Sequence, residues 1–133
     1  PGALEGRTLK DALEKMIREY QTLSNLQVDL HYEWVDVDMD VMIEDTIFRV
    51  IQESMTNAVR HGHASHMDLH FFEDEEDYMI ELQDNGVGFE TLTYGYGLKQ
   101  MMERISILGG QLQFESRDGF FTRVSLPKYK EGR

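Results

Sequence analysis

The chain contains no cysteine, which excludes disulfide bonds and thiolate metal sites and is compatible with a reducing compartment. It has no apolar run close to the roughly 20 residues that cross a bilayer, and no secretory leader is visible. Basic residues are scarce, because 13 lysines and arginines accompany 25 aspartates and glutamates, for a net charge of -12. We therefore expect a cytoplasmic chain that does not bind nucleic acid or anionic membranes, whose phosphates it would repel.

The length and the apolar pattern predict one domain of helices and strands. At 133 residues the chain has the size of a single domain, and it contains no internal repeat. Apolar periodicity predicts helices over residues 8–24, 39–60 and 97–108. Alternating apolar residues predict strands over residues 27–35, 67–73, 78–83, 111–116 and 120–126. Thr8 is expected to cap the first helix, and Asp38 or Asp40 the second.

Two glycine pairs flank a short segment in the second half of the chain. Asp84-Asn85-Gly86-Val87-Gly88 ends the strand over 78–83, and the glycines allow the backbone to bend where a side chain would obstruct it. Gly95-Tyr96-Gly97-Leu98 opens the helix over 97–108. The unpaired amides of that helix would point back toward the first loop and attract phosphate. Residues 89–96, between the pairs, are the candidate for a lid.

A row of polar side chains runs along the helix over 39–60. Glu53 and Asn57 are four residues apart and share one face, which Arg60 and His61 continue. A separate face carries the apolar residues Ile47, Ile51, Met55 and Ala58. The helix therefore presents ligand-binding chemistry on one side and core residues on another.

Two metal-site interpretations are disfavoured by spacing. Asp36, Asp38 and Asp40 resemble the start of a calcium loop, but Val41 and Ile47 stand where an EF-hand needs glycine and glutamate. We expect a solvated turn there instead.

The histidines at positions 61, 63, 66 and 70, with Asp68, suggest a zinc site. Zinc ligands must converge, whereas this run crosses a helix end, a loop and a strand, so a zinc site is disfavoured. On that strand His66, Asp68 and His70 would share one face.

Three motifs together resemble a known superfamily. Glu53 to Asn57 with His61 resembles the N box of the GHKL ATPases, Asp84 to Gly88 the G1 box, and Gly95 to Leu98 the G2 box. Within that superfamily the chain is most similar to the ATP-binding catalytic domain of sensor histidine kinases that signal to LuxR/NarL-type response regulators. The narrower similarity rests on residues 48–53, 57–61, 97–98, 102–104 and 108–110.

The resemblance implies a fold and a domain organisation. The expected fold is α+β, a two-layer α/β sandwich whose mixed, mostly antiparallel sheet is covered on one face by three helices. Residues 8–127 would form the ATP-binding catalytic domain, residues 1–7 the remnant of a linker, and residues 128–133 a polar tail. Kinases of this family are commonly multidomain and often membrane-tethered, so we expect an excised module of a larger protein.

The resemblance also assigns the adenine contacts. Asp84 would read the amino group of adenine, a role that suits a carboxylate at the floor of an apolar pocket. Gly86 and Gly88 would let the backbone approach the base and sugar. Thr122 would support adenine recognition through water.

The resemblance assigns the metal and phosphate contacts to the N box and the G2 box. Asn57 would supply an oxygen ligand to Mg²⁺, and Glu53 would orient a metal-bound water or take part in proton transfer. Arg60, His61 and Lys99 would offset phosphate charge. Backbone amides for the phosphates would come from Gly95, Gly97 and Leu98.

The implied activity needs partners. In the resembling kinases ATP gives its γ-phosphate to a histidine on a separate phosphoacceptor helical domain. That histidine then passes the phosphoryl group to an aspartate on a response regulator. No acceptor motif is present in these 133 residues. We expect the domain alone to be a monomer that binds Mg-ATP with little autophosphorylation, and the parent kinase to be a homodimer.

The sequence departs from the family pattern in two places. The family often shows Gly-x-Gly-Thr near the last strands, whereas this chain reads Gly119-Phe120-Phe121-Thr122, and the lid region is short, without a clear F box. Two alternatives therefore stay open. One is a stand-alone GHKL serine kinase acting on an anti-sigma antagonist, and the other is a non-catalytic nucleotide-binding or dimerisation module in which Phe121 blocks the pocket.

Overall fold

The computed structural model describes residues 2–35, 37–89 and 95–128. The described residues form, in chain order, α1 (Leu9–Leu23), β1 (Gln27–Tyr32), α2 (Val41–Arg60), β2 (His66–Glu73), β3 (Asp77–Asp84), α3 (Tyr96–Ile107), β4 (Gln111–Ser116) and β5 (Phe120–Pro127). Each predicted helix and strand is present, with ends that differ by up to three residues from the prediction.

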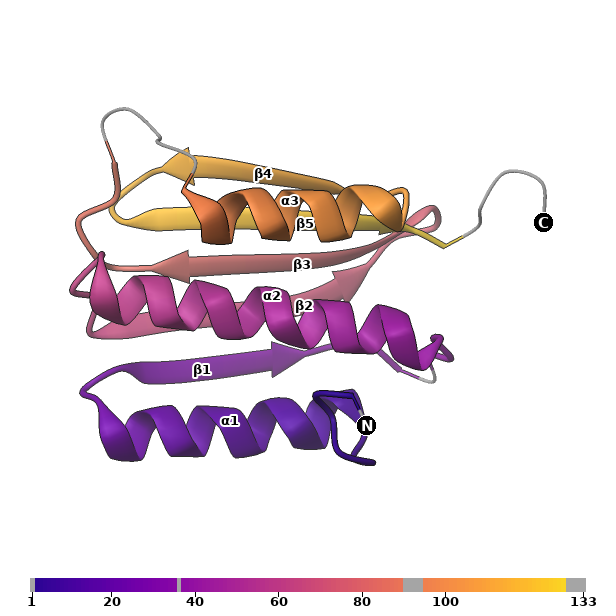
Figure 1. The fold of residues 1–133 in the computed structure, drawn as a ribbon, viewed down its shortest axis with the longest axis horizontal. Helices are drawn as coiled ribbons and strands as arrows, with labels where there is room; N and C mark the ends of the chain where they lie inside the picture. Colours follow the sequence, from indigo (N-terminus) through magenta and orange to yellow (C-terminus); the bar gives the residue numbers. More distant parts are fainter. Residues whose placement is uncertain (1, 36, 90–94, 129–133) are drawn as a thin grey trace.

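The strands form one mixed sheet in the order β1-β2-β3-β5-β4 (Figure 1). β1 pairs in parallel with β2, and the remaining neighbours are antiparallel, as predicted. A parallel pair needs a long crossover, because the chain must return to the same end of the sheet. α2 supplies that crossover, which brings the helix across the sheet.

The helices form one layer against one face of the sheet. α1 packs against α2, and α2 packs against α3. Along β2 the side chains of Met67, Leu69 and Phe71 are buried, whereas His66 and its alternate neighbours Asp68 and His70 are partly exposed. This alternation shows that the second face of the sheet is open, so the predicted two-layer sandwich is confirmed.

Local capping explains where the helices start. The Thr8 hydroxyl accepts a hydrogen bond from the Asp11 amide at 3.1 Å, as predicted. Asp40 caps α2 by accepting from the Met42 amide at 2.8 Å, so α2 begins at Val41 and not at residue 39. α3 follows Gly95, and within the part of the chain that the structure describes no side chain caps it.

The strand predicted over 27–35 is too long, since β1 ends at Tyr32. Beyond it Trp34 turns inward, where its indole N–H donates to the carbonyl of Phe72 at 2.7 Å. Its ring packs edge-on against Phe71 at 4.9 Å and lies 5.4 Å from Tyr78. Trp34, near the end of the predicted strand, therefore packs in an aromatic cluster and does not continue the sheet.

The segment before α1 is fastened to the domain. Leu4 is buried in the core, and the Ala3 amide donates to the Asp45 carboxylate on α2.

Of the predicted tail over 128–133, the structure describes Lys128, whose ammonium lies 2.7 Å from a Glu73 carboxylate oxygen. The rest of the tail, and residues 90–94 of the predicted lid, lie outside the described residues. Among the helices described, none combines the length and apolar character that a membrane span needs.

The one-sided core makes a prediction about two adjacent phenylalanines of β2. Phe71 is fully buried under the helices, whereas Phe72 lies on the open face against His70. Phe71→Ala should lower the free energy of unfolding by about 3–5 kcal/mol, because it leaves a cavity. Phe72→Ala should cost about 1 kcal/mol, the ordinary cost of a point substitution. Urea unfolding followed by circular dichroism measures both, and equal losses would contradict a core on one face.

Candidate functional site

A cavity of about 490 Å³ lies where α2, the end of β3, the start of β5 and the start of α3 meet. It draws on residues far apart in sequence, so the fold is what creates it. Nine of the residues singled out from the sequence line it, namely Glu53, Asn57, His61, Asp84, Gly88, Gly95, Gly97, Leu98 and Thr122. Three others, Arg60, Gly86 and Lys99, are not among the lining residues that the structure describes.

Asp84 lies at the end of β3 with 5% of its surface exposed. Its Oδ1 accepts hydrogen bonds from the amides of Gly86 and Phe120, both at 2.9 Å. Within the described residues, both hydrogen bonds to this carboxylate end on Oδ1, which leaves Oδ2 available to a ligand. A carboxylate acceptor in the wall of a cavity favours a ligand with an N–H donor.

Two glycines hold this strand end in place. A Cβ on Gly119, whose φ is +134°, would come within 2.0 Å of the Asp84 carbonyl oxygen. A Cβ on Gly86 would come within 2.5 Å of the Gly62 carbonyl oxygen, and the Val87 amide donates to that same oxygen at 3.0 Å. Gly86 therefore docks the loop after β3 onto the end of α2, beside the cavity.

α2 contributes the polar row expected from its spacing. Glu53 and Asn57 are half-buried and line the cavity one turn apart, and His61 lines it at the helix end. Arg60 is exposed and lies outside the lining. Carboxylate and amide oxygens one turn apart suit a Mg²⁺ ion, which prefers oxygen ligands and keeps several waters. The donor set therefore fits that ion.

The start of α3 faces the same cavity through Gly95, Gly97 and Leu98. Because no side chain of the described residues caps this end, its first amides can bind an anion, and the helix dipole adds positive potential. The α-carbon of Gly97 lies against Glu53, since a Cβ there would come within 1.9 Å of Glu53 Oε1. This contact brings α2 and α3 together at one point. The side chain of Lys99 is exposed just beyond.

The cavity walls include apolar residues that sequence reasoning did not identify. Met67, Leu82 and Met101 line it, as do Phe89 and Phe120, whose rings lie 5.1 Å apart. Phe89 directly follows the first glycine pair, and Phe120 directly follows Gly119. Their position next to these glycines is the sequence feature that could have indicated that they line the cavity. The predicted residue Thr122 lies beside these apolar walls and is 3% exposed, and no hydrogen bond of its hydroxyl is found among the described residues.

Phe121 does not enter the cavity. Strand alternation turns its side chain to the open face of the sheet, where the guanidinium of Arg117 lies 3.5 Å from its ring centroid. Arg123 lies 5.2 Å from the same centroid. The cavity is instead lined by its neighbours Phe120 and Thr122. The strand register therefore speaks against the alternative in which Phe121 blocks the pocket.

Comparisons with known proteins agree with this geometry. The family model of histidine kinase-, DNA gyrase B- and HSP90-like ATPases matches residues 42–130. The chain is 34% identical over 133 residues to UhpB of Salmonella typhimurium, a signal transduction histidine-protein kinase/phosphatase. It is 30% identical over 129 residues to the sensor histidine kinase LiaS of Bacillus subtilis. These alignments include 96% and 95% of this chain but 26% and 35% of the relatives, so it spans about a quarter to a third of their length.

Solved structures share the fold at low sequence identity. The histidine kinase AdeS of Acinetobacter baumannii matches with a TM-score of 0.78 at 20% identity, over 91% of this chain and 65% of that one. The ATP-binding domain of PrrB from Mycobacterium tuberculosis matches with a TM-score of 0.74 at 20% identity, over 90% and 93%. These structures show that the chain has the fold of histidine kinase ATP-binding domains. The family match leads to one conclusion: this chain belongs to the histidine kinase-, DNA gyrase B- and HSP90-like ATPases.

Proposed function

We propose that the cavity binds Mg-ATP and presents the γ-phosphate to a histidine on a separate phosphoacceptor domain. The observation that carries this proposal is the convergence of Asp84, Asn57 and Gly97 on one cavity, although they come from three separate segments. A single nucleotide can then meet a carboxylate, an amide oxygen and free backbone amides at once.

The base end of the cavity would take adenine. Asp84 Oδ2 would accept from the exocyclic amino group, while Oδ1 stays bound to the amides of Gly86 and Phe120. The unpartnered Thr122 hydroxyl lies on the neighbouring strand β5 and would bind the base directly or through water. The apolar walls fit the faces of a purine, and Gly88 lets the main chain come close to it.

The phosphate end would hold the metal and the triphosphate. Asn57 would ligate Mg²⁺ and Glu53 would orient a water bound to it or accept a proton. When bound, the ion supplies positive charge that offsets the phosphates. The amides at Gly95, Gly97 and Leu98 would bind phosphate oxygens, and His61, Lys99 and Arg60 would add positive charge at the rim.

Phosphoryl transfer depends mainly on positioning and charge, so a domain without its own nucleophile can support it. The acceptor would be a histidine on a helical phosphoacceptor domain of the same kinase, and a LuxR/NarL-type response regulator would receive the phosphoryl group next. We propose a homodimeric, cytoplasmic-facing parent kinase, with residues 8–127 as its ATP-binding unit. Phe121, on which the blocked-pocket alternative depended, faces away from the cavity, and this supports the catalytic proposal.

The role of Asp84 predicts the effect of an isosteric substitution. Asp84→Asn keeps an oxygen for the two backbone amides but places an amino group where the adenine N–H should bind. Loss of a hydrogen bond to a charged group, about 1.5–3 kcal/mol, should weaken ATP binding roughly 10- to 100-fold. Isothermal titration of the chain with Mg-ATP measures this change, and thermal unfolding shows whether the fold is retained.

Asp74→Asn is the matched control for that experiment. The Asp74 carboxylate also accepts two backbone amides, from Asp77 at 2.7 Å and Glu76 at 2.9 Å, but it lies in the β2–β3 turn. The Asp77 amide first, and then the Glu76 amide, lower the pKa of Asp74. The substitution should leave ATP affinity unchanged. Equal ATP affinity of Asp84→Asn and the native chain would refute the adenine role of Asp84. A native chain that does not bind ATP would favour a module without nucleotide chemistry.

The metal role of Asn57 makes a separate prediction. Asn57→Ala should remove most of the affinity that Mg²⁺ adds, so that titrations with Mg²⁺ and with EDTA give similar values for the variant. Gln52→Ala, on an exposed face of the same helix, is the control and should keep the full Mg²⁺ effect. An undiminished Mg²⁺ effect in Asn57→Ala would exclude this residue as a metal ligand.

A further inference from the structure

The open face of the sheet carries histidines and carboxylates on the two strands β1 and β2. The parallel register places Asp29 opposite Asp68 and His31 opposite His70. On β2, Met67 lines the nucleotide cavity, whereas its neighbours His66 and Asp68 point to the opposite, open face. The group therefore lies outside the ATP site, with the sheet between them.

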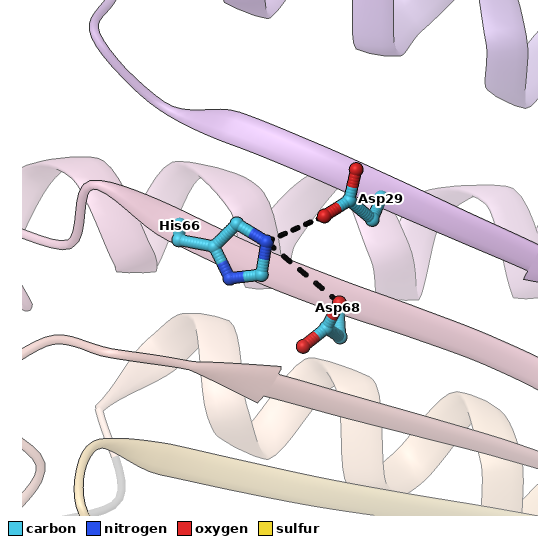
Figure 2. Close-up of side chains that lie close together, drawn as sticks. All are labelled: Asp29, His66 and Asp68. Atoms are coloured by element: carbon cyan, nitrogen blue, oxygen red, sulfur yellow. Dashed lines mark hydrogen bonds and ion pairs between the residues drawn. The ribbon is translucent and has the colours of Figure 1, made fainter.

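Three of these side chains converge on one point (Figure 2). His66 Nε2 lies 2.7 Å from Asp29 Oδ2 and 3.7 Å from Asp68 Oδ1, and one ligand atom from each residue lies within 4.8 Å of the others. Figure 2 shows the imidazole edge turned toward both carboxylates. Metal–ligand bonds of about 2.0–2.2 Å place neighbouring ligand atoms roughly 3–3.5 Å apart, so small side-chain adjustments suffice to surround an ion.

The two aspartates form an unfavourable pair without a cation. Like charges directly opposite each other on adjacent strands destabilise a sheet. In the stretches that the structure covers, the ion pairs of Asp29 and Asp68 are with His66 and His31, which are charged only when protonated, and neither involves lysine or arginine. A bound divalent cation would remove this repulsion at any pH where the imidazole is neutral.

We propose that Asp29, His66 and Asp68 bind a divalent transition-metal ion of the Zn²⁺ type. One imidazole nitrogen with two carboxylate oxygens suits Zn²⁺ better than Mg²⁺, which prefers oxygen ligands in a near-ideal octahedron. Three protein ligands leave a coordination position open for water or for His31, whose Nε2 lies 3.8 Å from Asp68 Oδ1. The side chains of His66 and Asp68 are 35% and 48% exposed, so the ion can enter from solvent without opening the core.

Titration of the tag-free chain with ZnCl₂ tests the site. The native chain should bind one Zn²⁺ in isothermal titration, in the absence of nucleotide. Loss of even an outer partner of a metal ligand weakens affinity about 10- to 100-fold, so His66→Gln and Asp68→Asn should each weaken Zn²⁺ binding at least about tenfold. His70→Gln is the matched control, because His70 lies on the same strand and face and pairs with Glu33 at 2.8 Å, outside the triad. It should bind Zn²⁺ as the native chain does.

Thermal unfolding gives an independent readout. Without metal, Asp68→Asn should be at least as stable as the native chain, because one of the two opposed charges is gone. With ZnCl₂, the melting temperature should rise for the native chain and for His70→Gln but not for Asp68→Asn, since binding to the folded state alone stabilises it. Equal binding by all variants would refute the triad in favour of nonspecific binding by surface histidines.

The ATP proposal and the metal proposal fail separately. Asp84→Asn should retain full Zn²⁺ affinity while losing ATP, and His66→Gln should retain ATP affinity while losing Zn²⁺. A native chain that binds Mg-ATP but not Zn²⁺ would overturn the metal proposal alone.

Discussion

The cavity depends on one carboxylate and the two amides that hold it. Asp84 Oδ1 joins its own loop, through the Gly86 amide, to the start of β5, through the Phe120 amide. The main chains are so close here that a side chain on Gly119 would meet the Asp84 carbonyl within 2.0 Å. Because the strand end is fixed this firmly, the second carboxylate oxygen has a defined position before any ligand arrives. Such preorganisation lowers the ordering cost of binding.

The one-sided packing of the sheet separates two kinds of chemistry on a single strand. Met67 of β2 contributes to the covered cavity, while His66 and Asp68 on either side of it face solvent. The covered face holds a cavity with largely apolar walls. The open face holds charged groups that remain hydrated and accessible to ions. The alternation of a β-strand is the physical reason that both can exist within three residues.

Much of this arrangement was predictable from sequence, because the signals are local. Helix faces, the caps at Thr8 and Asp40, and the glycine loops follow from periodicity and backbone chemistry. What was missed depends on which side of a strand a residue faces and which strand lies beside it. One alternative placed Phe121 in the pocket, whereas its ring lies on the other face. Asp29 joins His66 only because β1 pairs with β2. Tertiary contact also decides the end of β1, where Trp34 leaves the sheet to bind the Phe72 carbonyl.

The position of Phe121 has a consequence for how molecules of this protein meet one another. Arg117 and Arg123 cover its ring, and Arg123 is itself held by Glu81 at 2.8 Å. A large aromatic group at the start of β5, on the uncovered face of the sheet, is thereby given a hydrophilic exterior, since the guanidinium planes lose little hydration when they stack. Without this cover, the bare ring would favour face-to-face stacking of sheets from different molecules and hence aggregation. By covering the Phe121 ring, the two arginines thus favour solubility of the protein over aggregation.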